Sequence, residues 1–224
     1  MHITDDDPPV LLDHLLIPVG AKLEIQAHVV TALIGGYLPR SLDNLKNFSG
    51  FTAIELYPRM YYSNIKFSGP NGQVNITLKS HGDDPTGSML QSLAELGTSK
   101  TERLHIIAGH LLSREPLYQA LLPMKDLRTL TLSGRTNPDI FISALQPATS
   151  SLEAIICPKL EKIILVIQFE ETFDVTSMVE MAAARASGGM KLRTIRIIDG
   201  QGGAELDVPE LRKHVWNMEY GPGV

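Results

Sequence analysis

The chain has 224 residues, of which 43% are hydrophobic and 20% are charged, and these proportions are typical of an ordinary globular protein. The formal net charge is −5 and the sequence pI is about 5.8. Such a chain has no basic field that would attract nucleic acid or an anionic membrane surface. We therefore expect neither nucleic acid nor a membrane as a partner.

Cysteine content and the N-terminal sequence indicate the compartment. Cys157 is the only cysteine, so the chain can form neither an intrachain disulfide nor a four-thiolate metal site. An acidic run, Asp5–Asp7, stands where a secretion signal would carry basic and then apolar residues. The best apolar run, Ile163–Ile167, is far shorter than the roughly 18 residues that span a bilayer. These features predict a soluble intracellular protein of the cytoplasm or nucleus.

Short apolar strands recur along the whole chain. In each strand two aliphatic residues are separated by one other residue, which places both on one face of a sheet. We expect that face to be the core. The first members of successive pairs lie between 22 and 33 residues apart. The seven pairs are Leu23/Ile25, Ile54/Leu56, Ile76/Leu78, Leu104/Ile106, Leu130/Leu132, Ile163/Leu165 and Ile195/Ile197.

A turn signal interrupts this series. Ser68–Gly72 reads SGPNG and joins an apolar segment at 65–67 to the strand at 74–78. Proline and glycine in such a cluster favour a tight reversal between two strands. The sequence therefore predicts a hairpin inserted near 64–79.

Helix signals fill most of the gaps between strands. Apolar residues at helical spacing follow polar residues that can cap a helix N-terminus, and glycines follow the last turns. The expected caps are Asp84, Ser113, Asn137 and Ser177, the last of which would form a capping box with Glu180. Gly97 and Gly188–Gly189 are expected to end the first and last of these helices.

Three strands share a longer template. Leu127–Leu132, Leu160–Leu165 and Leu192–Ile197 each read L-x-x-L-x-L with aliphatic substitutions, and their spacing slightly exceeds the about 20 to 29 residues of a leucine-rich repeat. The repeat's usual Asn or Cys is replaced by Arg135, Gln168 and Gly200.

Strand and helix units of this kind bury their apolar faces by stacking on one another. We expect one α/β domain over 1–224, an irregular leucine-rich-repeat solenoid whose curved, mainly parallel sheet carries helices on its convex side. A C-terminal cap is expected near 205–224, where Trp216, Met218 and Tyr220 alternate.

Three segments carry a family resemblance: Pro8–Ile25, Cys157–Ile163 and Glu210–Pro222. The chain resembles the F-box-like leucine-rich-repeat proteins expanded in mushroom-forming fungi. The resemblance implies a substrate-recognition subunit, in which a helical F-box binds a ubiquitin-ligase adaptor and the repeats hold the target. Only about 22 residues precede Leu23, and they contain Pro8, Pro9 and Pro18. That is too short for a three-helix F-box, so an adaptor is expected as a partner only if an F-box lies upstream.

Catalytic and cofactor motifs are absent from the sequence. The seven histidines are scattered, no H-E-x-x-H or phosphate-binding glycine motif occurs, and His105 and His110 would not share a helix face as metal ligands do. We therefore expect no enzyme activity, no cofactor and no metal. Two alternatives stay open: a cryptic hydrolase-like enzyme that uses Cys157 with His105 or His110, and a truncated scaffold with no independent function.

A protein-binding face follows from strand alternation. Residues flanking the core aliphatics should point outward and stack in columns. A mixture of basic, small polar and aliphatic side chains is typical of a protein-binding surface. The alternative is that Ile164, Val166 and Ile198 are covered by a loop or by the end of the chain. The predicted binding residues are Arg103, His105, Thr129, Thr131, Lys162, Ile164, Arg196 and Ile198.

Overall fold

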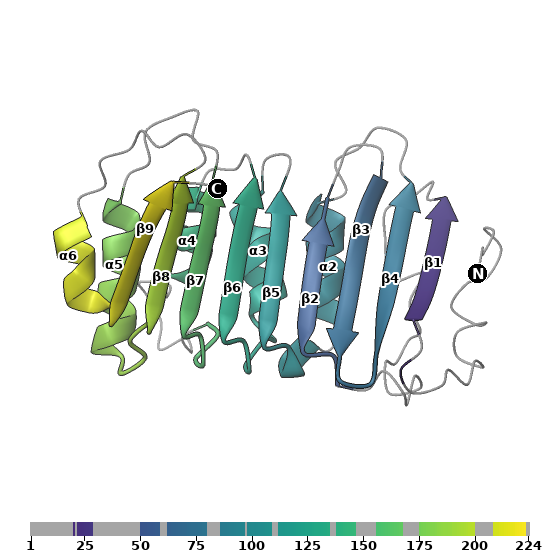
Figure 1. Cartoon of the computed structure of the whole chain (residues 1–224), viewed down its shortest axis with the longest axis horizontal. Helices are drawn as coiled ribbons and strands as arrows, with labels where there is room; N and C mark the ends of the chain where they lie inside the picture. Colours follow the sequence, from purple (N-terminus) through teal and green to yellow (C-terminus); the bar gives the residue numbers. More distant parts are fainter. Residues whose placement is uncertain are drawn as a thin grey trace.

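The computed structural model describes residues 20, 22–28, 50–58, 62–79, 86–96, 98–108, 112–134, 138–146, 156–167, 175–199 and 208–222. These residues form an open nine-stranded sheet with helices on one of its two faces (Figure 1). The chain is therefore an α/β protein with a mostly parallel sheet, as the alternation of strand and helix signals predicts.

The strands are β1 (Lys22–His28), β2 (Ala53–Tyr57), β3 (Tyr62–Gly69), β4 (Gly72–Lys79), β5 (Arg103–Ala108), β6 (Thr129–Gly134), β7 (Lys162–Ile167), β8 (Thr194–Asp199) and β9 (Asn217–Pro222). Their order across the sheet is β1-β4-β3-β2-β5-β6-β7-β8-β9. Only β3 runs antiparallel to its neighbours, β2 and β4, and every other adjacent pair is parallel.

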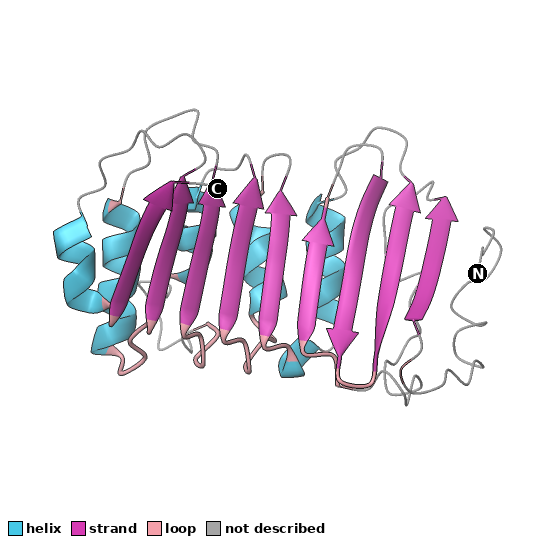
Figure 2. Cartoon of the chain, viewed as in Figure 1, coloured by secondary structure: helices cyan, strands magenta, loops and turns pink. Residues whose placement is uncertain are grey.

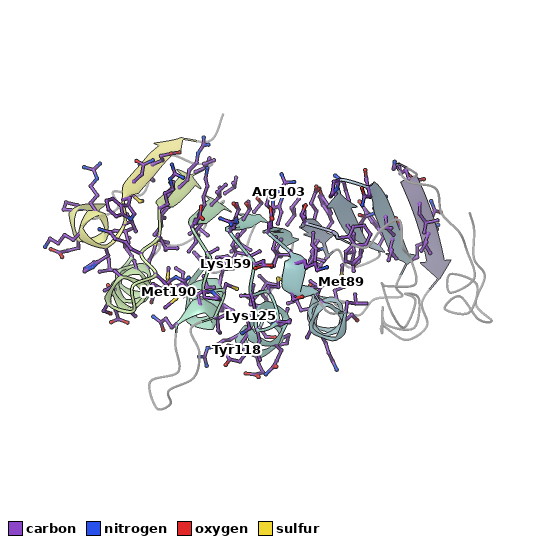
Figure 3. All side chains as sticks on the ribbon, turned by 90° about the horizontal axis from the view of Figure 1, so that it is seen from below. Met89, Arg103, Tyr118, Lys125, Lys159 and Met190 are labelled. Carbon is purple, nitrogen blue, oxygen red and sulfur yellow. The ribbon has the colours of Figure 1, made fainter. Side chains whose placement is uncertain are left out.

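The helices connect successive parallel strands. They are α2 (Thr86–Glu95), the short 3-10 helix η3 (Thr98–Lys100), α3 (Arg114–Leu121), α4 (Pro138–Leu145), α5 (Thr176–Ser187) and α6 (Val208–His214). Figure 2 shows α2 to α5 behind the sheet and α6 beside the edge strand β9, and Figure 3 shows α2 to α5 on one side of the sheet. The opposite face of the sheet, which we call the outer face, carries none of the described helices.

The core lies between the sheet and the helices. Every described aliphatic of the seven predicted pairs is buried except Leu23, which packs partly exposed against the core, and the side chain of Leu78 lies outside the described residues. Leu93, Leu117, Phe141 and Met181 complete this layer from four successive helices. The period-2 pattern of the strands and the helical spacing between them thus bury one continuous apolar layer.

The parallel strands from β2 to β8 are held in register where they begin. The carbonyl oxygen of the residue before each strand accepts two backbone N–H groups from the next unit, at N···O distances of 2.8 to 3.0 Å. The acceptors are Thr52, Glu102, Arg128 and Glu161, and the donors are Glu102/Arg103, Arg128/Thr129, Glu161/Lys162 and Arg193/Thr194. Equivalent positions of the L-x-x-L-x-L template therefore lie side by side in the sheet.

The predicted hairpin is formed by β3 and β4, whose pairing runs from Tyr62↔Lys79 to Gly69↔Gly72. Gly69 allows the turn to lie against the chain before β2, because a Cβ there would lie 2.8 Å from the carbonyl oxygen of Gly50. The hairpin also changes the strand order. β1 pairs with β4 and not with β2, so the first strand of the chain stands at the sheet edge.

The helix caps follow the sequence expectation only in part. α4 begins at Pro138, and Gly188 caps the C-terminus of α5, followed by Gly189 with φ of +77°. Ser113 occupies the N-cap of α3 but makes no side-chain capping bond. Asp84, Gly97 and Asn137 lie outside the described residues.

The capping box expected at Ser177 is wrong. α5 begins at Thr176, and its N-cap is Val175, whose carbonyl oxygen accepts the N–H groups of Met178 and Val179 at 3.0 Å. The helix therefore starts before Ser177 could cap it. Ser177 lies in the first turn, where its backbone carbonyl accepts a hydrogen bond from the Gln146 side chain at 3.3 Å.

The described part of the segment expected to cap the C-terminal end, residues 208–222, forms α6 and β9. β9 pairs parallel with β8 from Thr194↔Asn217 to Asp199↔Pro222, so this segment continues the sheet as its last strand. Trp216, which directly precedes β9, is 76% exposed, and the Lys191 ammonium lies 5.0 Å from its ring centroid. The alternating aromatic residues are thus placed on the edge unit of the sheet.

Candidate protein-binding face

All eight residues predicted to bind a partner lie on the outer face of β5 to β8. They alternate along each strand with the buried aliphatics, so their side chains leave the sheet on the side away from the helices. Figure 3 shows this for Arg103, which lies on the opposite side of the sheet from Tyr118 and Lys125. The fold therefore brings together residues from four strands that are widely separated in the sequence.

Strand register arranges this part of the outer face, which we call the repeat patch, in three rows. The first row is Arg103, Thr129, Lys162 and Thr194; the second is His105, Thr131, Ile164 and Arg196; the third is Ile107, Ser133, Val166 and Ile198. Neighbours within a row belong to adjacent strands about 4.8 Å apart, and successive rows are two residues apart along each strand.

The first two rows carry the positive charge of the repeat patch. Among the described residues, neither Arg103 nor Lys162 has an ion-pair or hydrogen-bond partner for its side chain. Arg196 pairs with Glu219 of β9 at an Nε–Oε2 distance of 3.6 Å. The described residues thus neutralise the cations of this patch only weakly.

Ile164 of the second row and Val166 and Ile198 of the third row form an aliphatic cluster. Ile164, Val166 and Ile198 are each partly buried and keep part of their surface exposed. Val166 and Ile198 are paired across β7 and β8, and Ile164 lies two residues before Val166 on the same face. Apolar side chains therefore meet solvent beside the cations, as a binding surface requires.

His105 forms a hydrogen bond across the patch. Its Nε2 lies 2.8 Å from the hydroxyl oxygen of Ser133 on β6. Burial lowers the pKa of the imidazole below its ordinary value, and the neighbouring Glu55 carboxylate only partly opposes this shift. His105 is therefore mainly neutral at neutral pH, and it adds no permanent charge to the patch.

A polar cluster borders the repeat patch at β2 and β3. The Glu55 carboxylate accepts hydrogen bonds from the Lys66 ammonium at 2.8 Å and from the Tyr57 hydroxyl at 2.6 Å. Burial opposes ionisation of Glu55, but these donors outweigh it and hold its pKa below the ordinary value. The bond to Glu55, helped by burial, raises the pKa of Tyr57 to about 12. The sequence analysis missed this cluster. Glu55 lies between the core residues Ile54 and Leu56, so the same alternation that identified the repeat patch also places Glu55 on the outer face.

The thiol of Cys157 lies on the helix side of the sheet. It is fully buried and contacts the backbone oxygen of Leu121 at 3.5 Å, whereas His105 lies on the outer face. Burial raises the pKa of Cys157 to about 12. The sheet therefore separates Cys157 from His105, and His110 lies outside the described residues.

Arg185 of α5 is a buried cation that the sequence pattern did not single out. Its guanidinium is 0% exposed and donates to the backbone oxygens of Ile156 at 2.9 Å and Cys157 at 2.8 Å. Burial lowers its pKa. These bonds fasten the turn that leads into β7 to the helix layer, so Arg185 positions the centre of the repeat patch from behind.

Metal ligands do not gather within the described ranges: no group of three or more His, Cys, Asp or Glu residues there could hold an ion. None of the helices in the described part of the chain is long and apolar enough to cross a bilayer. Comparison with family models, curated proteins and solved structures finds no match to this chain.

Proposed function

We propose that the chain is a non-catalytic protein-recognition module that holds its partner on the repeat patch. The observation that carries this proposal is that cations and partly exposed aliphatics from four strands in register lie together on the face that carries none of the described helices. Two of these cations, Arg103 and Lys162, have no partner among the described residues. Strands fix such side chains more rigidly than loops, so little conformational entropy is lost when a partner binds.

The proposal includes the repeat architecture. Support for an irregular leucine-rich-repeat solenoid comes from the equivalent registers of β5 to β8 and from the shared carbonyl acceptors at their starts. Under this proposal the chain acts as the target-binding part of an F-box-type ubiquitin-ligase receptor, and contact with the ligase adaptor depends on an F-box upstream.

The enzyme alternative has weaker support. A hydrolase that used Cys157 would need an accessible thiolate beside an imidazole. The thiol is buried, its pKa is raised to about 12, and His105 lies across the sheet from it. A reactive-cysteine probe at neutral pH should therefore leave Cys157 of the folded chain unlabelled, whereas rapid labelling would favour the enzyme.

Site-specific photo-cross-linking tests the recognition function. A photoreactive amino acid replaces Thr131 at the centre of the repeat patch, and a matched variant carries it at the exposed Gln119 on α3. In native extract the Thr131 variant should capture a protein that the Gln119 variant does not capture. The purified partner should then bind the Ile164→Glu variant at least about tenfold more weakly, since a buried apolar contact is replaced by a charge.

Two results would contradict the proposal. Equal capture from Thr131 and Gln119 would show that the repeat patch has no preferred partner. Absence of any captured protein at Thr131 would favour the scaffold without an independent function.

A further inference from the structure

The charges of the outer face are unevenly distributed. Along β5 to β9 its described side chains include three permanent cations, Arg103, Lys162 and Arg196, and one carboxylate, Glu219. The whole chain has a net charge of −5. The positive potential of this surface is therefore strongest where the partly exposed aliphatics Ile164, Val166 and Ile198 also lie.

Several other charged residues of the repeat units are ion-paired, in contrast to Arg103 and Lys162 on the outer face. At the starts of the strands, Arg128 pairs with Glu161 at 2.7 Å, and Lys159 pairs with Asp126 at 2.6 Å. Each pair joins neighbouring repeats, and its two charges neutralise each other. The outer-face cations Arg103 and Lys162 have no such partner among the described residues.

A protein that covers these cations must supply opposite charges. Burying an unpaired charge at an interface costs several kcal/mol, whereas burying it against an opposite charge can be neutral or favourable. A partner that covers the repeat patch must therefore supply carboxylates to Arg103 and Lys162. Arg196 can exchange its long contact with Glu219 for a shorter one.

The register sets the spacing of these carboxylates. Arg103 and Lys162 occupy the same row and are separated by β6, so their backbones lie about 10 Å apart, with Thr129 between them. The aliphatic cluster follows in the next two rows. A complementary segment thus has acidic groups along one side and apolar side chains along the other.

We infer that the partner presents an acidic and partly apolar protein segment to the repeat patch, an inference that rests on the proposed function. Carboxylates about 10 Å apart bind Arg103 and Lys162. A further carboxylate binds Arg196, and apolar side chains cover Ile164, Val166 and Ile198.

A nucleic acid is a poorer occupant of the same cations. Single strands are usually held by aromatic side chains on which bases stack. The described outer-face residues of β5 to β8 include no Phe, Tyr or Trp, and exposed aliphatics give a phosphate backbone no favourable contact. The net charge of −5 would also repel a long polyanion.

Fluorescence anisotropy with defined probes tests the inference. The main probe is a short fluorescein-labelled peptide of glutamate and leucine, and the comparison probes are a lysine–leucine peptide, a glutamate–serine peptide and an oligothymidylate. The wild-type chain should bind the glutamate–leucine peptide most tightly, and the binding should weaken as salt rises. The glutamate–serine peptide should bind more weakly because it lacks the apolar contact.

A charge-reversal pair supplies the matched control. Lys162→Glu with Arg196→Glu should weaken binding of the glutamate–leucine peptide by about tenfold or more. Lys100→Glu with Lys125→Glu makes the same change in net charge at exposed positions outside the repeat patch and should leave binding nearly unchanged. Circular dichroism and urea denaturation should show that both double variants remain folded.

The outcomes separate this inference from the proposed function. If the glutamate–leucine peptide does not bind, or if both double variants weaken it equally, the acidic-partner inference is wrong. Tighter binding of oligothymidylate that is lost in Lys162→Glu/Arg196→Glu would also overturn it. In each case, capture of a protein at Thr131 would leave the recognition function standing, whereas loss of that capture as well would remove both.

Discussion

The outer face has two halves, β1 to β4 (the hairpin half) and β5 to β9 (the repeat half), and they differ in how their charged side chains are paired. On the hairpin half, Lys22 pairs with Glu24, Lys66 pairs with Glu55, and the Asn64 amide bonds to the Thr77 hydroxyl at 2.9 Å. On the repeat half, Arg103 and Lys162 have no partner among the described residues, Arg196 has only the long contact with Glu219, and partly exposed aliphatics lie beside them. Polar groups that bond one another form a surface complete in water, whereas unpaired cations and apolar side chains gain from a partner. The two halves thus differ in degree: most charges of the hairpin half are paired, with Lys79 the exception among its described lysines, whereas Arg103 and Lys162 of the repeat half are not.

The largest expected change in stability follows substitution of Arg185, which is buried behind the repeat half. Replacing it with Ala leaves the backbone oxygens of Ile156 and Cys157 without their donor and opens a cavity. We expect Arg185→Ala to lower the free energy of unfolding by about 2 to 5 kcal/mol. Urea denaturation followed by circular dichroism measures this change.

The exposed Arg103 provides the control for that comparison. Arg103→Ala should change the free energy of unfolding by no more than about 0.5 kcal/mol, because it removes no internal contact. A loss of stability in Arg103→Ala as large as in Arg185→Ala would mean that the repeat patch is needed for folding. It would contradict the view that the repeat half is a surface available for binding.

A second prediction compares two lysines of the outer face. Lys66→Ala leaves the half-buried Glu55 without its ion-pair partner and should cost about 1 kcal/mol or less. Lys162→Ala should leave stability nearly unchanged but weaken binding of the glutamate–leucine peptide. Urea denaturation and anisotropy, measured on both variants, should give opposite rankings. If the same variant lost more stability and more peptide binding, the two lysines would not have the separate roles that we assign to the two halves.

The smallest effect is the alkaline titration of Tyr57 in the hairpin half. Its folded pKa of about 12 lies above the ordinary value of 10.0, so the protonated phenol favours the folded state. This contribution is fully present below about pH 10 and is lost as the pH rises toward 12. Tyr57→Phe should therefore show a shallower loss of stability across this interval, by less than about 1 kcal/mol.

Urea denaturation at several alkaline pH values, together with tyrosinate absorbance, checks this titration. Tyr118→Phe on α3 is the control, because Tyr118 lies on the helix side, away from Glu55. If both Phe variants flatten the pH dependence equally, the Glu55 bond does not control the ionisation of Tyr57.

Local pattern was enough to predict much of the sheet. Alternation identified the strands around Ile54, Leu104, Leu130, Ile163 and Ile195, and the turn at 68–72 identified the hairpin. These features depend on backbone geometry within a few residues, which a sequence displays directly. The same alternation fixed which residues of β5 to β8 face away from the helices.

Long-range contacts were not predictable in the same way. Ser177 and Glu180 matched a capping box, yet the backbone starts α5 at Thr176. The sequence pattern did not single out Arg185, which is buried because α5 packs against the turn before β7. A capping preference is worth only about 1 kcal/mol, and the contacts of Arg185 join segments about 28 residues apart, so neither outcome can be read from a local pattern.

The sequence by itself determined the strands, most helices and the face on which each strand residue lies, because these follow from residue periods of 2 and 3.6. Only the tertiary structure decided which charges meet. Placing β1 beside β4 and β3 beside β2 brings Lys66 to Glu55, whereas the parallel register of β5 to β7 leaves Arg103 and Lys162 separated by Thr129. Strand order and register arise from hydrogen bonds between distant segments, and they decide that Lys66 meets a carboxylate whereas Arg103 and Lys162 meet none among the described residues.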